Sequence, residues 1–372
     1  MIYQAECTDA HCGARTGAVT LPHGILHTPV FMPVATGGTV RGVRLEDLHS
    51  LRFPIILANT YHLYLRPGTK IIQEFGGLHE FIHWQNNILT DSGGYQIFSL
   101  SALRKVHDDG ITFRSHIDGS HHFLSPEMVV DIQLILNSDI QMPLDICTPA
   151  GISHDEAARA LVTTTQWAQK AKKHLFTHRK NYRGHIFGIV QGNFYEDLRR
   201  ISAEQVCGLD FAGYAIGGLS VGESFENFRH FLAWTAALLP ENKPRYLMGI
   251  GTPEYILEAI EHGIDMFDCV FPTRIGRNGT CLTSHGRLVL KNRRYASDSR
   301  PIMEEGPIAR YSRSYLRHLF KSGEMLGPML ASLHNLWFLA DLVEKAASAI
   351  RENSFRTFKE HFLTMYSAGQ EY

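Results

Sequence analysis

Two short stretches decide the fold: Asn87–Gln96, which reads NILTDSGGYQ, and Ile264–Arg274, which reads IDMFDCVFPTR. In each, an apolar run ends at an aspartate, Asp91 in the first and Asp268 in the second, and a glycine pair or a Pro-Thr-Arg loop follows. Short apolar runs without polar alternation are typical of strands that are buried on both faces. A carboxylate that ends such a strand is held rigidly, so both aspartates are predicted to face a pocket.

Runs of the same kind recur along the chain, most of them separated by helix-like segments such as His154–His178 and Tyr195–Val206. The predicted strands are His27–Thr36, Pro54–Asn59, Asn87–Asp91, Asp139–Asp145, His185–Gln191, Gly213–Gly217, Arg245–Gly249 and Ile264–Cys269. Parallel strands with interposed helices predict an α/β fold, specifically a (β/α)8 TIM barrel. A doubly wound open sheet is the alternative. The barrel is favoured because polar residues follow many strand ends, not one switch point.

The chain adds two elements to the predicted barrel. After the third strand, Ile111–Phe123 reads as a β-hairpin insertion that turns at Asp118-Gly119. After the eighth, helices are predicted over Arg313–Phe320 and Leu326–Ala349. Because the sequence contains no internal repeat or long linker, residues 1–372 are predicted to form a single elaborated domain. Within it, residues 271–349 form a basic, helical C-terminal extension.

The distribution of charge indicates which kind of partner the protein binds, and the pattern of cysteines indicates its cellular compartment. From Phe271 to Met325 the chain carries eleven Lys and Arg residues against four Asp and Glu, although the net charge of the whole protein is −1. Such clustering is expected of a surface that binds a phosphate backbone, with a solvated basic face as the alternative. The six cysteines are scattered without a C-x-x-C pair, which is typical of reduced thiols in a cytoplasmic protein. No apolar run is long enough to predict a membrane helix.

The carboxyl ends of parallel barrel strands meet at one mouth, where barrel enzymes place their sites. The residues at the predicted strand ends should therefore meet at this mouth. They are Thr36, Asn59, Asp91, Asp145, Gln191, Gly217, Gly218, Met248 and Asp268. Gly93 and Gly94 let the backbone approach a flat ligand, and Tyr95 can stack on that ligand. Asp145, Gln191 and backbone N–H groups suit the hydrogen-bonding edge of a purine-like base. Taken singly, each also has a structural explanation, such as a helix cap, a tight turn or core packing.

These residues lie within long strings that resemble the tRNA-guanine transglycosylases, of the bacterial type. The strings are PVFMPVATGGTVRG, LANTYHLYLRPG, LTDSGGYQ, SPE, DICTP, GIVQG, GGLSVGE, MGIGTPE, DMFDCVFPTRIGRNG, SRSYLRHLF and HNL, and the resemblance covers the chain from about Thr16 to Phe362. The resemblance implies a pentosyltransferase of queuosine tRNA modification. Such an enzyme exchanges guanine at the anticodon wobble position for a 7-deazaguanine base, either 7-aminomethyl-7-deazaguanine or queuine, through a covalent enzyme–RNA intermediate.

The resemblance also assigns roles to individual residues. Asp268 would be the nucleophile on the ribose anomeric carbon, and Asp91 the proton acceptor and donor. The base would be bound by Ser92, Gly93, Gly94, Tyr95, Asp145, Gln191, Gly217, Gly218, Leu219 and Met248. RNA would contact Gly249, Ile250, Gly251, Thr252, Pro253, Glu254, Tyr255, Thr273, Arg274, Ile275, Gly276 and Arg277. Two carboxylates also agree independently with cleavage of a glycosidic bond, in which one traps the sugar and two inversions give net retention.

The chain departs from the family in two places. The family's structural zinc is bound by a Cys-x-Cys-x-x-Cys cluster and a later His, but Pro301–Arg313 contains no cysteine and only His334 remains. No zinc, other metal or cofactor is therefore predicted, and the family's homodimer, which uses this region, is less secure here. In the base pocket, Ile146 replaces a usual Glu, and Ser220 precedes Val221, so queuine is expected to be accepted at a measurable rate.

Two other functional classes compete with this interpretation. A carbohydrate-acting glycosidase could use the same two acids on the same barrel, but the sequence offers no aromatic-lined sugar cleft. A catalytically inert RNA-binding subunit would have no need of both Asp91 and Asp268. Exchange of radiolabelled guanine into unmodified tRNA separates the transglycosylase from both alternatives.

Overall fold

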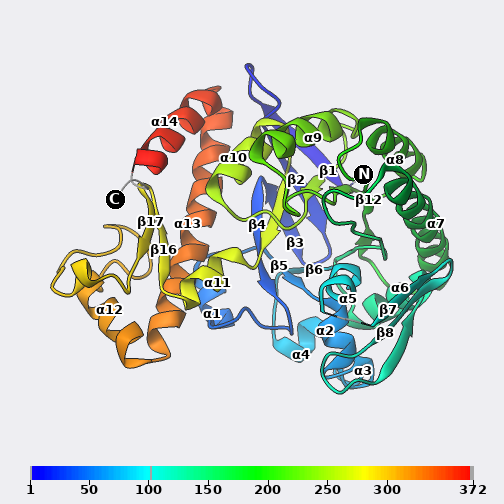
Figure 1. Ribbon diagram of the computed structural model, residues 1–372, viewed down its shortest axis with the longest axis horizontal. Coiled ribbons are helices and arrows are strands. Elements are labelled where there is room, and N and C mark those ends of the chain that lie inside the picture. Colours follow the sequence, from blue (N-terminus) through cyan, green and yellow to red (C-terminus); the bar gives the residue numbers. More distant parts are fainter. Residues whose placement is uncertain (1, 101–102, 369–372) are drawn as a thin grey trace.

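The computed structural model describes residues 2–100 and 103–368 and contains a closed parallel barrel. Its strands are β4 (Val30–Ala35), β5 (Ile55–Ala58), β6 (Asn87–Thr90), β10 (Ile140–Gln141), β11 (His185–Ile186), β12 (Gly188–Val190), β13 (Tyr214–Ile216), β14 (Arg245–Leu247) and β15 (Met266–Cys269). The sheet order runs from β11 to β12, two segments separated only by Phe187. They act as one fifth strand, so the sheet closes on itself (Figure 1). The predicted (β/α)8 barrel is confirmed.

Helices surround the barrel (Figure 1). They are α1 (Leu45–Ser50), α2 (Thr60–Leu65), α3 (Thr69–Glu74), α4 (Leu78–Ile82), α5 (Gly94–Leu100), α6 (Pro126–Leu136), α7 (His154–His178), α8 (Glu196–Gly208), α9 (Phe225–Ala237), α10 (Pro253–Glu261) and α11 (Phe271–Arg277). The bounds of α7 are those predicted, because Ser153 and Glu156 form a capping box that fixes its start. Ser125 likewise caps α6 by accepting from the Met128 N–H.

The N-terminal segment forms an antiparallel sheet that the sequence did not reveal. Its strands are β1 (Tyr3–Thr8), β2 (Arg15–Leu21) and β3 (Gly24–Thr28). The prediction of one strand over His27–Thr36 is therefore wrong at its start, since His27 and Thr28 belong to β3 and the barrel strand begins at Val30. Pro29 separates the two strands because proline has no N–H with which to continue a ladder.

This sheet covers the N-terminal end of the barrel, opposite the mouth. Its side chains Val19, Leu21 and Leu26 share one apolar core with the barrel interior. A buried ion pair joins Arg15 to Asp265 at 2.6 Å. These contacts seal the barrel bottom and leave the mouth as its open end.

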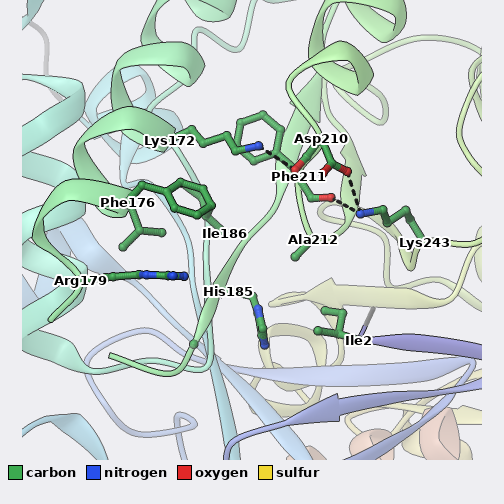
Figure 2. Close-up of a pocket in the computed structure, with 12 residues that line it drawn as sticks. Ile2, Lys172, Phe176, Arg179, His185, Ile186, Asp210, Phe211, Ala212 and Lys243 are labelled. Carbon is green, nitrogen blue, oxygen red and sulfur yellow. Dashed lines mark hydrogen bonds and ion pairs between the residues drawn. The ribbon is translucent and has the colours of Figure 1, made fainter. Parts of the chain in front are cut away.

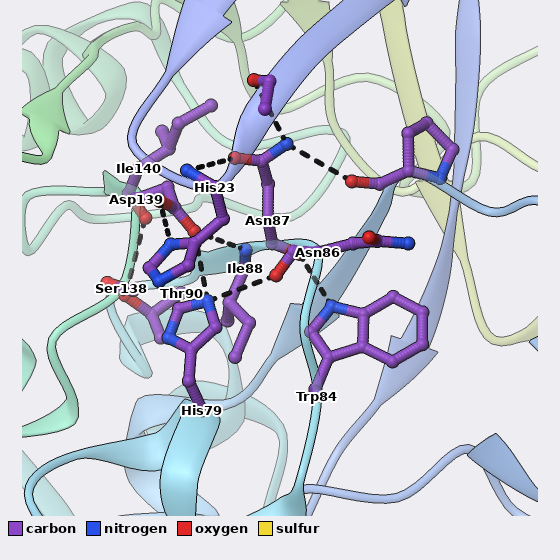
Figure 3. A network of polar contacts seen from close by, with 12 residues as sticks. His23, His79, Trp84, Asn86, Asn87, Ile88, Thr90, Ser138, Asp139 and Ile140 are labelled. Carbon is purple, nitrogen blue, oxygen red and sulfur yellow. Dashed lines mark hydrogen bonds and ion pairs between the residues drawn. The ribbon is translucent and has the colours of Figure 1, made fainter. Parts of the chain in front are cut away.

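A polar network fastens the β2–β3 turn to the same end of the barrel (Figure 3). His23 Nδ1 lies 2.7 Å from Asp139 Oδ1, and His79 Nε2 lies 3.2 Å from Asp139 Oδ2. The Ile88 N–H donates to Asp139 Oδ2 at 2.7 Å, and Asn87 Oδ1 accepts from the His23 N–H at 3.3 Å. The buried Asp139 carboxylate is thus fully engaged, and the network serves to hold the turn in place.

The predicted insertion after the third barrel strand is present but larger than expected. The hairpin consists of β8 (Gly110–Arg114) and β9 (His121–Leu124), which supports the predicted turn at Asp118-Gly119. A third strand, β7 (Arg104–His107), pairs with β8. Its side chains are mostly exposed, so it lacks the apolar run from which a strand is predicted.

The C-terminal extension lies beside the barrel, at the left of Figure 1. Its elements are β16 (Thr280–Thr283), β17 (Gly286–Val289), η1 (Arg293–Tyr295), α12 (Arg313–Ser322), α13 (Leu326–Arg351) and α14 (Phe355–Ala368). The sequence predicted α12 and α13 to within about two residues but missed α14. The extension has its own small core, formed by Cys281, Leu288, Leu290, Tyr295, Ile302, Ile308, Leu316, Leu319 and Ala331.

Candidate active site

Asp91 stands directly after β6 and faces the start of α2. Its Oδ1 accepts from the N–H groups of Thr60 at 3.0 Å and Gly93 at 3.2 Å, and its Oδ2 accepts from Asn59 Nδ2. Burial raises the pKa of Asp91 to about 7, against the lowering effect of these donors, and the charge of Asp268 adds to the rise. A carboxyl group with such a pKa can both hold and release a proton near neutral pH.

Asp268 occupies β15, and one of its two oxygens is fully engaged. Oδ1 accepts from the Tyr246 hydroxyl at 2.6 Å and from the Gly249 N–H at 2.7 Å. Among the described residues no group donates to Oδ2, which leaves that oxygen available for attack. Burial raises the pKa of Asp268, and the two donors oppose that rise.

The sequence did not single out Tyr246, which is 1% exposed. It precedes Met248 by two residues, so alternation along β14 directs both side chains to the same side of the strand. That spacing from a predicted site residue was the only signal that could have identified it. Its phenol, together with the Gly249 N–H, orients the Asp268 carboxylate.

Asp145 and Gln191 form the floor of the predicted base pocket. Gln191 Nε2 donates to Asp145 Oδ2 at 2.8 Å, and Ser92 Oγ donates to Asp145 Oδ1 at 3.2 Å. Gln191 Oε1 is buried without a hydrogen-bond partner among the described residues. An unmatched buried acceptor of this kind is expected where a ligand supplies the missing donor.

Glycines keep this pocket open. A Cβ on Gly217 would lie 2.6 Å from Gln191 Nε2, and one on Gly218 would lie 2.6 Å from Gln191 Oε1. A Cβ on Gly94 would lie 2.8 Å from the Asp145 carbonyl oxygen. Any larger residue at these positions would therefore displace the amide or the backbone that lines the pocket.

The remaining predicted base contacts lie around the mouth. Tyr95 is 57% exposed on α5, so its ring is free to stack on a ligand. Met248 is partly exposed just after β14. Leu219, in contrast, is 4% exposed and offers a ligand mainly its backbone. Gly93 packs against Tyr61, and its φ of 77° is a conformation that favours glycine.

The predicted RNA contacts differ in accessibility. In the segment after β14, Gly249 is exposed, whereas Ile250 and Pro253 are buried, so only the backbone of these two could meet RNA. On α11, Arg274 is exposed and Arg277 is partly exposed. The other predicted contacts are partly exposed (Thr252, Glu254, Tyr255 and Ile275) or buried (Gly251, Thr273 and Gly276).

Arg41 joins these arginines, although no sequence pattern had selected it. Burial lowers the pKa of Arg277, and the positive charges of Arg41 and Arg274 lower it further. Arg277 therefore lies close enough to both of these arginines to be repelled by their charges. Such a group of positive charges is an attractive surface for a phosphate or a base edge.

The zinc implied by the family resemblance does not fit the extension. His334 Nε2 lies 2.8 Å from the Leu282 carbonyl oxygen, and burial lowers the His334 pKa to about 4. Cys281 is packed in the small apolar core, where burial raises its pKa to about 12. In the part of the chain that the structure describes, no group of three His, Cys, Asp or Glu side chains surrounds His334.

A cavity of about 270 Å³ lies away from the aspartates, at the N-terminal ends of β11 and β13 (Figure 2). Its cations are largely satisfied by the protein. Lys172 Nζ donates to the Leu209 and Asp210 carbonyls, and Lys243 Nζ donates to Asp210 Oδ1 at 3.0 Å. The mouth with its two aspartates remains the better candidate for chemistry.

Of the helices in residues 2–100 and 103–368, none has the length and apolar character needed to cross a bilayer.

Comparison with known proteins identifies the family. A family profile described as Queuine tRNA-ribosyltransferase matches residues 9–368. A queuine tRNA-ribosyltransferase of Caldanaerobacter subterraneus subsp. tengcongensis is 51% identical over 99% of this chain and 98% of its own length. Proteins of the same name from Thermoanaerobacter pseudethanolicus and Enterococcus faecalis are each 49% identical, over 100% and 98% of this chain and 99% and 96% of their own lengths. The chain belongs to the queuine tRNA-ribosyltransferase family.

Proposed function

We propose that this protein exchanges guanine at the wobble position of tRNA for a 7-deazaguanine base, in queuosine modification. The observation that carries the proposal is the pair Asp91 and Asp268 at one barrel mouth. Asp268 accepts two hydrogen bonds at Oδ1 and none at Oδ2 from the residues that the structure describes, and the Asp91 pKa is raised to about 7. The full-length similarity to proteins named queuine tRNA-ribosyltransferase supports the same activity.

In the first half-reaction, Asp268 Oδ2 attacks C1′ of the ribose. The glycosidic bond to guanine breaks as positive charge develops on the sugar, and protonated Asp91 gives its proton to the departing base. The product is a covalent ester between Asp268 and the RNA, and the phosphodiester backbone stays intact.

The second half-reaction reverses these roles. Asp91, now ionised, removes a proton from N9 of the incoming base, and N9 attacks C1′ to release the Asp268 carboxylate. Two successive inversions retain the configuration at C1′. An Asp91 pKa near neutrality suits a group that must donate in one step and accept in the next.

Base recognition uses the floor of the pocket. The Asp145 carboxylate accepts from the ring N–H and amino group of a guanine-like base, and Gln191 with the Gly218 amide addresses the base carbonyl. Burial raises the pKa of Asp145, and the Gln191 and Ser92 donors oppose this rise. Tyr95 and Met248 would cover the two faces of the base, which has to leave the anticodon stack to enter.

The RNA partner would approach across α11 and the extension. Arg274 and Arg277, with Arg41 beside them, are proposed to read bases next to the wobble position. The basic surface that includes Arg293 would bind phosphates without regard to sequence.

A cytoplasmic location is proposed from the six cysteines, all of which are free thiols.

A second copy of this chain is proposed to cover the groove between α1 and the extension. The groove has a volume of about 450 Å³ and is lined by Arg44, Asp47, Tyr311, Leu326 and Met329 among others. Next to it, Met325 is 81% exposed, which is unusual for a large apolar side chain. Light scattering of the purified protein would show a dimer, and Met325→Glu would shift it to the monomer. A wild-type monomer at micromolar concentration would refute the proposed dimer.

Radiolabelled guanine exchange into unmodified tRNA tests the proposed activity. Wild-type protein is expected to incorporate label and to form a denaturation-resistant adduct with tRNA. Asp91→Asn should suppress turnover while tRNA affinity stays close to that of wild type, because the change removes a proton carrier and leaves the binding surface intact. Release of free ribose or cleavage of oligosaccharides without exchange would instead indicate a glycosidase.

A further inference from the structure

Arg199 on α8 is a fully buried cation that forms no ion pair with a carboxylate of the described residues; burial lowers its pKa to about 10, and the charge of Glu223 opposes this lowering. It is 0% exposed, and its partners among the described residues are backbone carbonyls. Nε donates to the Asn193 carbonyl at 2.7 Å, and Nη2 donates to the carbonyls of Gly217 at 3.2 Å and Gly218 at 3.4 Å. Nη1 is buried with no partner in the described part of the chain. Burying a guanidinium in this way is unfavourable, so core packing does not explain its presence.

The Arg199 contacts fix the direction of two peptide planes. In a trans peptide the C=O and the following N–H point in opposite directions. When the carbonyls of Gly217 and Gly218 turn toward Arg199, the N–H groups of Gly218 and Leu219 turn away from it. The φ of 68° at Gly218 lets successive N–H groups converge, which creates a concave site for an oxygen acceptor.

Arg199 also connects the loops that carry the other base contacts. Asn193, whose carbonyl it holds, donates from Nδ2 to Thr148 Oγ1 and to the Pro149 carbonyl, both at 2.9 Å. The Gln191 N–H donates to Ser202 Oγ on the same helix at 3.0 Å. One helix therefore fixes the loops after three neighbouring barrel strands, those that supply Asp145, Gln191 and Gly218.

We propose that Arg199 is a positioning residue for base recognition, which holds the Gly217–Leu219 backbone with its N–H groups aimed at the carbonyl oxygen of the incoming purine-like base. This inference rests on the proposed base exchange. Arg199 touches neither base nor RNA in this role and acts only through the loop. Because the Arg199 guanidinium keeps its positive charge, its hydrogen bonds to the three carbonyls are stronger than those that a neutral side chain would donate.

The test is a comparison of Michaelis constants in guanine exchange. Arg199→Met removes the donors while keeping the length of the side chain, and it should raise the KM for guanine about tenfold, as expected from loss of one or two hydrogen bonds. The KM for tRNA should stay within about twofold of wild type, because the RNA surface is untouched. Arg200→Met, on the exposed face of the same helix, is the matched control and should change neither constant.

Two further variants make the outcome decisive. Arg199→Lys keeps the charge but cannot reach Asn193 and both glycine carbonyls together, so its KM for guanine should lie between those of wild type and Arg199→Met. An unchanged KM for guanine in Arg199→Met, or a loss of turnover alone with lower thermal stability, would overturn the proposal. Asp145→Asn separates the two hypotheses: if it leaves the KM for guanine unchanged, the assigned base pocket is wrong, and the role of Arg199 in it fails as well.

Discussion

Removing the hydroxyl of Tyr246 should move the acidic limb of the pH–rate profile. Tyr246→Phe preserves the shape of a side chain that is 1% exposed and deletes only the donor 2.6 Å from Asp268 Oδ1. A hydrogen bond to a charged group contributes about 1.5–3 kcal/mol, which corresponds to roughly one to two pKa units. Because the lost bond stabilises the ionised carboxylate, the Asp268 pKa should rise by about that amount.

The consequence can be measured with kcat/KM for guanine exchange as a function of pH. The nucleophile has to be ionised and Asp91 protonated, so a bell-shaped profile is expected, and its basic limb should fall near the Asp91 pKa of about 7. Tyr246→Phe should shift the acidic limb upward by roughly one to two units and leave the basic limb nearly in place. An acidic limb that does not move, with normal folding, would refute the claim that Tyr246 controls the ionisation of Asp268.

Four further outcomes are expected. Asp268→Asn should abolish exchange and any denaturation-resistant tRNA adduct, because an amide is a poor nucleophile; an adduct that persists on gels would mean another residue attacks. Arg274→Ala should weaken discrimination between cognate and altered anticodon loops by about 1–3 kcal/mol, whereas Arg293→Ala should weaken all tRNAs alike and reduce the salt dependence of binding. Metal analysis should find no zinc whose retention depends on His334, and a stoichiometric zinc lost in His334→Ala would contradict this. Queuine should be used at a measurable rate in competition with guanine and the aminomethyl base, and Ile146→Glu should shift use toward the aminomethyl base; a queuine rate of zero in wild type would exclude relaxed specificity.

The barrel could be predicted because its strands are buried on both faces. Alternate residues of the apolar runs that end at Asp91, Gln191 and Asp268 fill the barrel (Leu89, Ile189 and Met266), while their neighbours pack in the core outside it (Ile88, Val190 and Phe267). The polar residue after each run marks the mouth. The same reasoning could not predict the sheet formed by β1, β2 and β3. Its strands are partly exposed, and one of them merges in sequence with the first barrel strand, so only Pro29 marks the boundary.

Part of the candidate site could be predicted from the sequence, for a related reason. Residues that end strands are recognisable by position, whereas those that support them from a neighbouring strand or helix are not. The residues of this second kind are Tyr246, Arg41 and Arg199, which act on residues that are distant from them in the sequence. Nothing in their local sequence distinguishes them from core or surface residues. Their partners are set by the closure of the barrel, which brings together segments that are far apart in the chain.

The small core of the extension has a consequence for how the enzyme withstands stress. The family resemblance implies a zinc held by thiolates in related extensions, and peroxide and chelators attack such metal–thiolate bonds. Here the extension depends on apolar contacts and on Asp298, which accepts from Arg300 at 2.8 Å and Arg313 at 3.4 Å. The Arg300 side chain is the main cause of the lowered Asp298 pKa, so this support is complete above the ordinary aspartate range and is lost only as the pH falls below it. Peroxide should therefore leave the RNA-binding surface intact, while cooling, which weakens apolar burial, should lower the stability of the extension.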